Sequence, residues 1–169
     1  MVHILHVVGC KDAGKTRACE VLIPPLQALG LAVGTLKHTE HEGFEWDVPG
    51  KDTDRHRRAG SAVTGIFGGQ RFAFSFNRLH GAEVPFDDLI RTFYGGLDLI
   101  LVEGYQRDPS LRLEVCRPDF STVPISPPQA LLATYGAELF GYRGCHFDYG
   151  KEAELARYVR DNLVRLRAV

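Results

Sequence analysis

The feature that most constrains the fold of this chain is a glycine-containing loop close to its N-terminus. The phosphate-binding pattern G-x-x-x-x-G-K-S/T matches residues 9–16, which read Gly9-Cys10-Lys11-Asp12-Ala13-Gly14-Lys15-Thr16. An apolar run, residues 2–8, precedes the loop, and a helix-compatible segment, residues 16–29, follows it. In this order of strand, loop and helix, backbone N–H groups and a helix N-terminus can surround a phosphate. The sequence therefore predicts nucleotide binding at residues 9–16.

Each part of the loop has its own predicted role. Lys15 can reach the β- and γ-phosphates of a nucleotide, and the Thr16 hydroxyl can ligate Mg²⁺. The residues predicted to bind the nucleotide are Gly9, Asp12, Ala13, Gly14, Lys15 and Thr16.

A second candidate is Glu103, which with Gly104 ends the apolar run 97–102. An acid at the carboxyl end of a buried parallel strand lies beside the phosphate loop, where it can hold Mg²⁺ directly or through water. The alternative is a strand-end carboxylate in solvent, and the phosphate loop favours the metal role. Lys15 and Glu103 are the predicted catalytic residues. Asp98, at the other end of the strand, is expected to be structural.

The order of the expected elements predicts the fold class. Strands that alternate with helices indicate a single α/β domain over residues 1–169, a three-layer P-loop NTPase type with a mostly parallel sheet. Segments 62–67 and 71–77, joined by Gly68-Gly69-Gln70, predict a β-hairpin extension. We expect Pro24-Pro25 to kink or restart the first helix.

The C-terminal half gives three further expectations. Alternation over residues 111–116 predicts a strand with one face in solvent. Residues 130–134 are expected to form the last strand, and residues 152–166 the final helix. The four cysteines show no paired spacing, so we expect reduced thiols of a cytoplasmic protein.

Composition excludes several classes of protein. Twenty Lys and Arg against 21 Asp and Glu leave a formal charge of −1. This balance argues against a general nucleic-acid binder and leaves a local basic patch open. No apolar stretch approaches the roughly 18–20 residues of a membrane span, so no membrane association is expected. Guanine is often read by an N-K-x-D or T-K-x-D segment, and neither occurs, so the residues do not identify the base.

Three other groups of residues could carry function. Residues 50–60 gather cations on a short helix, which could hold a second anionic ligand or be a solvated face. Residues 37–42 contain transition-metal ligand types, which in a loop are more often solvated. Phe72, Phe74 and Phe76 give the hairpin an apolar face, which either covers a core or joins two subunits.

Several segments together resemble one family. They are the phosphate loop with its strand, Leu36-Lys37-His38, Pro49-Gly50-Lys51-Asp52 with Arg55-His56 and Ala59-Gly60, and Leu101-Val102-Glu103-Gly104-Tyr105. In this order they resemble the molybdopterin-guanine dinucleotide biosynthesis protein B family over about residues 2–117. The resemblance implies GTP and Mg²⁺ binding with slow GTP hydrolysis. It also implies an accessory role for a guanylyl transferase of molybdenum cofactor biosynthesis, and a homodimer formed partly through the strands after the charged helix.

The resemblance also implies roles for individual residues. Thr16 and Glu103 would lie at the metal, and Lys37, Asp52 and Arg55 would line a cleft for a second ligand, with molybdopterin as the candidate. Two positions depart from the family pattern. Gln106-Arg107 stands where a lysine is usual, and residues 133–136 lack the aspartate that often follows the last core strand, which leaves GTP over ATP open. The alternative function is a P-loop small-molecule kinase with Arg55 and Arg58 near the acceptor.

Overall fold

The computed structural model describes all residues of the chain except 41–43, 77–83, 106, 118, 120–123 and 138–141. By their internal contacts these residues form two compact units. The first unit comprises Met1–Thr39 with Asp87–Val169, and the second comprises Glu40–Phe86.

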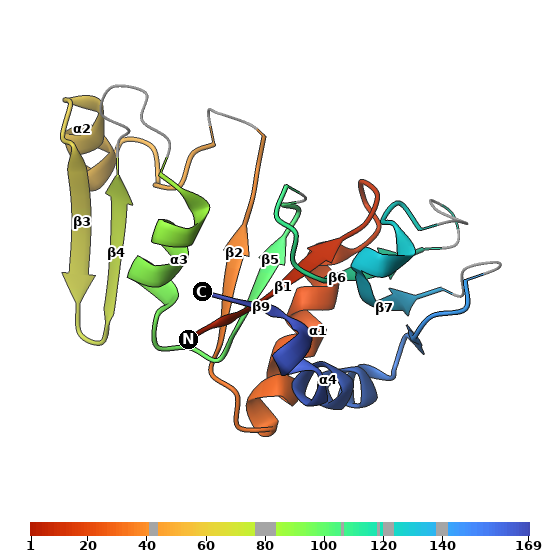
Figure 1. Cartoon of the computed structure of the whole chain (residues 1–169). Helices are drawn as coiled ribbons and strands as arrows, with labels where there is room; N and C mark the ends of the chain where they lie inside the picture. Colours follow the sequence, from red (N-terminus) through yellow and green to blue (C-terminus); the bar gives the residue numbers. More distant parts are fainter. Residues whose placement is uncertain (41–43, 77–83, 106, 118, 120–123, 138–141) are drawn as a thin grey trace. The chain divides into compact units, whose positions relative to one another are not determined.

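The first unit is built on a seven-stranded sheet (Figure 1). Its strands are β1 (His3–Val8), β2 (Val33–Lys37), β5 (Leu99–Glu103), β6 (Arg112–Cys116), β7 (Leu131–Gly136), β8 (His146–Asp148) and β9 (Arg167–Ala168). The order β2-β5-β1-β6-β7-β8 is parallel throughout, and β9 pairs antiparallel with β1. The loop at residues 9–16 therefore leaves the carboxyl end of a strand that lies between β5 and β6.

Both faces of this sheet are covered. Helices α1 (Lys15–Ala28) and α4 (Glu152–Asp161) pack together with Leu5 and Val7 in the main hydrophobic core. Ile4 and His6 point to the opposite face, because side chains alternate along a strand, and they are equally buried. Helix α3 (Phe86–Tyr94) contacts the sheet edge where Tyr94 donates a hydrogen bond to the carbonyl oxygen of Thr35 in β2. The predicted three-layer α/β fold is confirmed.

The second unit contains helix α2 (Asp52–Arg58) and a two-stranded antiparallel sheet of β3 (Val63–Gly68) and β4 (Arg71–Phe76). The pairing runs from Val63 opposite Phe76 to Gly68 opposite Arg71. Gly69, with φ 57°, adopts the left-handed conformation that a tight hairpin turn requires. The predicted hairpin extension is confirmed for the described residues; residue 77, the predicted end of its second strand, lies outside them.

Two local features, in α1 and in β6, differ from expectation. Helix α1 does not restart at Pro24-Pro25 but continues through both prolines, with Leu22 and Leu26 on either side buried in the core, and a kink there stays a prediction. The expected solvent face of β6 is also absent. Glu114 is buried there, and its two carboxylate oxygens accept hydrogen bonds from the backbone N–H groups of residues 125 and 126 at 2.6 and 2.9 Å.

The C-terminal elements also differ from expectation. Strand β7 is not the last, because β8 and β9 follow it. These strands have three and two residues, too few for a hydrophobic period to be recognised. The predicted final helix ends at Asp161 and is followed by a 3₁₀ turn, Leu163–Arg165.

Candidate functional site

The loop at residues 9–16 has a backbone that depends on its glycines. Gly9 has φ 147° and Gly14 has φ 95°. A Cβ atom on Gly9 would lie 2.6 Å from the carbonyl oxygen of Val115 in β6, so no larger residue fits there without a shift of the backbone. Asp12, with φ 61°, is the single non-glycine residue in the described chain with a positive φ. Such conformations, which cost free energy, gather at ligand-binding loops.

The loop surrounds the amino group of Lys15. Lys15 Nζ donates hydrogen bonds to the carbonyl oxygens of Gly9 at 3.1 Å and Cys10 at 2.8 Å. Helix α1 begins at Lys15, and it has no side-chain cap and no acidic residue in its first turn. Because the first N–H groups of a helix have no acceptor within the helix, they remain available to an anion. The loop therefore combines a fixed ammonium group with a helix N-terminus.

Glu103 lies directly beside this loop. The Thr16 hydroxyl donates a hydrogen bond to Oε1 of Glu103 at 2.9 Å, and Lys37 Nζ lies 3.3 Å from the same oxygen. The strand register explains the contacts, because Glu103 of β5 lies level with Val7 of β1 and with Lys37 of β2. The Glu103 side chain is 13% exposed and that of Lys37 is 66% exposed. Lys15, Thr16, Glu103 and Lys37 are thus brought together at one edge of the sheet.

The oxygens of Thr16 and Glu103 fit a magnesium site. Their separation of 2.9 Å is close to the spacing of about 3 Å between adjacent ligands of an octahedral ion with bonds of about 2.1 Å. Both are hard oxygen donors, which Mg²⁺ prefers. The two residues predicted for the metal therefore have the geometry that the role requires.

The other two predicted cleft residues belong to the second unit. Asp52 and Arg55 are both exposed on α2, one turn apart. Lys37 belongs to the first unit. The assignment of a second ligand to these three residues stays a prediction.

The cation cluster on α2 is organised by a residue that the sequence did not single out. Asp54 is buried and accepts hydrogen bonds from the Gly50 backbone N–H at 2.8 Å, from Arg57 at 2.8 Å and from Arg58 at 2.9 Å. The bond from Gly50, followed by that from Arg58, lowers the pKa of Asp54 to about 2. Arg57 and Arg58 also pair with Glu45. Arg58 is therefore engaged within its own unit.

A further cation contacts the phosphate loop. Arg117, which follows β6, donates a hydrogen bond to the carbonyl oxygen of Asp12 at 3.4 Å. Arg117 was not among the predicted site residues, although it carries the same sequence signal as Glu103, a charged residue at the end of a strand. Both residues lie at the carboxyl end of a strand next to β1.

The carboxyl ends of β7 and β8 carry a second cluster that the sequence did not reveal. Tyr135 Oη donates a hydrogen bond to Oε1 of Glu152 at 2.5 Å, and the Gly150 backbone N–H donates to the same oxygen at 2.9 Å. Burial and the Glu152 carboxylate raise the pKa of Tyr135, whereas the hydrogen bond from Tyr135 lowers the pKa of Glu152. Glu152 is thus ionised at neutral pH and held in place by two donors.

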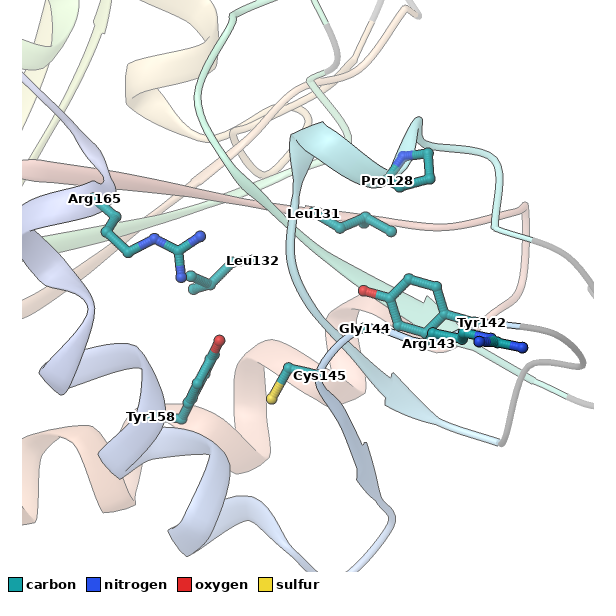
Figure 2. A pocket seen from close by; sticks show the side chains of 9 residues that line it. All are labelled: Pro128, Leu131, Leu132, Tyr142, Arg143, Gly144, Cys145, Tyr158 and Arg165. Atoms are coloured by element: carbon teal, nitrogen blue, oxygen red, sulfur yellow. The ribbon is translucent and has the colours of Figure 1, made fainter.

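A separate cavity of about 550 Å³ lies at the amino end of β7 (Figure 2). In the figure Arg165 and Tyr158 lie on one side of it and Tyr142 on the other. Its lining residues are Pro128, Leu131, Leu132, Tyr142, Arg143, Gly144, Cys145, Tyr158 and Arg165. Because β7 runs parallel to β6 and β1, this cavity lies at the edge opposite the phosphate loop. It contains none of the predicted site residues.

Some predictions are only partly covered by the described residues. Within that part of the chain, no group of three or more His, Cys, Asp or Glu side chains could hold a metal ion. The candidate transition-metal ligands His41 and Glu42 lie outside it. All four cysteines are free thiols, and burial raises the pKa of Cys19 and Cys116 to about 12. No helix among the described residues has the length and hydrophobicity to cross a membrane.

Comparison with known sequences identifies relatives with the same site-bearing region. Residues 4–135 match the family profile described as molybdopterin guanine dinucleotide synthesis protein B. The chain is 35% identical over 118 residues to the molybdopterin-guanine dinucleotide biosynthesis adapter protein of Escherichia coli, a match that covers 69% of this chain and 67% of that protein. The adapter protein of Haemophilus influenzae is 34% identical over 109 residues, which cover 64% of this chain and 60% of the relative.

Solved structures show the same fold. The crystal structure of Bacillus subtilis MobB superimposes with a TM-score of 0.67 at 24% identity and covers 99% of both chains. A MobB homologue from Bacillus stearothermophilus gives a TM-score of 0.65 at 20% identity and covers 95% of this chain and 97% of its own. These likenesses extend over almost the whole chain, including the elements after β7.

Proposed function

Because the chain belongs to the molybdopterin guanine dinucleotide synthesis protein B family, we propose that it is a GTP-binding adapter of molybdopterin guanine dinucleotide formation. The relatives are named as adapter proteins of this biosynthesis. In the proposal, GTP binds with its phosphates in the loop at residues 9–16. A guanylyl transferase that joins the nucleotide to molybdopterin is the partner, and the setting is the cytoplasm.

The observation that carries this proposal is that Lys15, Thr16 and Glu103 lie close together at one edge of the sheet. Lys15 and the N-terminus of α1 supply positive charge to the β- and γ-phosphates. Thr16 and Glu103 would hold Mg²⁺, which neutralises charge on the phosphates when it is bound. Without the ion, Lys37 supplies a positive charge next to Glu103.

We propose that GTP hydrolysis is slow. The carboxylate oxygen of Glu103 that faces the loop is occupied by the Thr16 hydroxyl and by Lys37. Glu103 therefore serves to hold the metal rather than to take a proton from an attacking water. Slow turnover suits an adapter, for which the bound nucleotide matters more than its cleavage.

We also propose a homodimer formed through the β3–β4 hairpin. Phe67, Phe72, Phe74 and Phe76 are between 55% and 89% exposed within the chain, and the strand register places them on one face of the hairpin. Apolar side chains in such a row favour burial against another surface, and β3 and β4 are also both edge strands. A second copy of the chain offers the same face, as a two-fold interface requires.

The experiment that tests the adapter function measures stimulation of the guanylyl transferase. Wild-type protein with GTP and Mg²⁺ should increase the yield of molybdopterin guanine dinucleotide. Arg55→Ala should lower that stimulation by about tenfold or more, as expected for a lost charge-assisted contact, while GTP affinity stays within a few-fold of the wild type. Arg157→Ala, which removes an exposed arginine from α4, is the matched control and should stimulate normally.

The same incubation separates the adapter from a small-molecule kinase. A kinase would form nucleoside diphosphate together with a stoichiometric phosphorylated acceptor, detected by mass spectrometry as a product heavier by one phosphoryl group. Such a product, formed without the transferase, would contradict the adapter function. The engagement of Arg58 with Asp54 and Glu45 also leaves it poorly placed as the acceptor-site cation of a kinase.

A further inference from the structure

The cluster at Glu152 lies at the same edge of the sheet as the phosphate loop. Strand β7 runs parallel to β6, and its last residue, Gly136, is level with Cys116 at the end of β6. The next residue after Cys116 is Arg117, which contacts the loop at Asp12. Ligands of open α/β sheets bind at this carboxyl edge. A nucleotide whose phosphates occupy the loop would extend along the edge toward β6, β7 and β8 or toward β5 and β2.

Side chains at β7 and β8 form a site that is suited to an aromatic base. Tyr149 is 54% exposed, and its Oη donates a hydrogen bond to the Cys116 carbonyl oxygen at 3.1 Å. Its ring meets that of Tyr135 edge to face, with a centroid distance of 5.3 Å. A Cβ atom on Gly136 would lie 2.2 Å from the Cys116 oxygen and about 3.0 Å from Tyr149 Oη, so this close packing requires glycine. Tyr149 is therefore held as a partly exposed ring at the edge.

The carboxylate of Glu152 is held next to these rings. Its Oε1 accepts hydrogen bonds from both the Tyr135 hydroxyl and the Gly150 backbone N–H. Both of these donors bind Oε1, so the carboxylate keeps acceptor capacity for a ligand at Oε2. Arg17, in the first turn of α1, lies close enough to lower the pKa of Glu152. The carboxylate is thus ionised, oriented and within the electrostatic reach of the helix that follows the phosphate loop.

We propose that Glu152 is the residue that selects guanine, with Tyr149 as the stacking surface for the base. This inference rests on the proposed function, because it requires a nucleotide in the phosphate loop. Guanine presents two neighbouring donors, its N1–H and its 2-amino group, which Oε2 of the Glu152 carboxylate can accept. Adenine presents an acceptor at N1 and no amino group at C2, so the ionised oxygen would face a lone pair. The site would therefore reject ATP by leaving a charged group unpaired.

The role proposed for Glu152 would decide between GTP and ATP, a choice that the sequence left open. Residues 133–136, which end β7, contain no acid, and no N-K-x-D or T-K-x-D segment is present. The fold instead brings a carboxylate to the end of β7 from the first residue of α4, through the hydrogen bond from Tyr135.

The test measures the affinities of wild type and Glu152→Gln for GTP, ATP, ITP and XTP by calorimetry with Mg²⁺. The wild type should bind GTP most tightly, ITP less tightly because it lacks the 2-amino group, and XTP and ATP weakest. Glu152→Gln should lower GTP affinity by at least about tenfold, because a contact to a charged group is lost. The same variant should bind XTP more tightly than the wild type does, since its amide can donate to the 2-oxo group.

Two further variants complete the design. Glu154→Gln, an exposed acid on the same helix that pairs with Lys151, is the matched control and should keep the wild-type preference. Tyr149→Ala should lower the affinities for GTP and for ATP by the same factor, because stacking on the ring does not depend on which purine base is bound. If Glu152→Gln does not fold, the wild-type order GTP, ITP, XTP still tests the inference.

The failures of the two proposals are distinguishable. A wild-type protein that binds GTP in the phosphate loop, but keeps the same ratio of GTP to ATP affinity after Glu152→Gln, overturns the role of Glu152 and leaves the adapter function standing. A wild type that prefers ATP, or that binds XTP as tightly as GTP, also overturns it. No binding of any nucleotide by folded protein overturns both proposals.

Discussion

Thr16 Oγ1 donates a hydrogen bond to Oε1 of Glu103 across 2.9 Å, and this contact joins two residues that are 87 positions apart in the sequence. It exists because the helix that begins at Lys15 starts beside the carboxyl end of β5. The pair links the loop for the phosphates to the acid proposed for the metal, so the two functions belong to a single site.

Replacing either Thr16 or Glu103 should remove most of the dependence of GTP binding and GTP hydrolysis on Mg²⁺. Glu103→Gln preserves the shape of the side chain and removes its charge, and Thr16→Val removes the hydroxyl oxygen. Both variants should bind GTP without metal as the wild type does, and both should lose most of the tightening that Mg²⁺ gives and most of the hydrolysis. Calorimetry at several Mg²⁺ concentrations and phosphate release measure the two effects. Glu20→Gln, an exposed acid on α1, is the control, and wild-type hydrolysis by Glu103→Gln would remove Glu103 from the metal site.

Gly9→Ala should damage the loop and the stability together. Its Cβ would lie 2.6 Å from the Val115 carbonyl oxygen, and φ 147° is unfavourable for alanine. The expected loss in the free energy of unfolding is about 1–3 kcal/mol, with GTP binding lost in the protein that remains folded. Gly96→Ala, where an added Cβ meets no atom within 4 Å, should be close to neutral in a denaturant titration. Equal stability of the two variants would show that Gly9 is not required.

The proposed dimer should depend on the hairpin. Phe74→Asp places a charge in the centre of the exposed row and should convert a dimer into a monomer of 18.8 kDa in analytical ultracentrifugation. Val164→Asp changes a residue that is 89% exposed and lies in the first unit, and it should leave the dimer intact. A wild-type protein that sediments as a monomer at micromolar concentration would contradict the proposed interface.

His6 should make stability depend on pH below neutrality. Burial lowers the pKa of His6 from its ordinary value of 6.5, against the opposing effect of the hydrogen bond with Asp108. Arg112 also lowers this pKa. Since the unfolded chain then takes up a proton that the folded chain does not, stability is full above about pH 6.5 and falls as the pH decreases toward the folded pKa. Thermal unfolding of wild type and His6→Gln between neutral and mildly acidic pH measures this, and the variant should show the flatter profile. Titration of the His6 ring at or above pH 6.5 in NMR spectra would contradict it.

The parts of the fold that could be predicted from the sequence are those set by local pattern. The phosphate loop, the buried strand that ends at Glu103 and the hairpin each carry their signal within one short run of consecutive residues. Glu103 could also be placed beside the loop, because parallel strands bring their carboxyl ends to one edge.

The features that were missed depend on contacts between distant segments. Glu114 alternates with apolar residues as a solvent-facing side chain would, yet segment 124–126 covers it and supplies two N–H donors. Asp54 is one of several acids in a charged helix, and only the fold shows that Gly50 and two arginines converge on it. The contact between Tyr135 and Glu152 joins a strand to the start of a helix 17 residues later, and no local period indicates it.

The most direct test of the proposed function compares GTP binding by wild type, Lys15→Ala and Lys11→Ala in calorimetry with Mg²⁺. Both lysines belong to the loop, but Lys11 is exposed whereas Lys15 Nζ is held by the carbonyl oxygens of Gly9 and Cys10. We expect one GTP per chain, a loss of at least about tenfold in affinity for Lys15→Ala, as for a lost charge-assisted contact, and a small change for Lys11→Ala. Unchanged GTP affinity in folded Lys15→Ala, or no GTP binding by the wild type, would contradict the account.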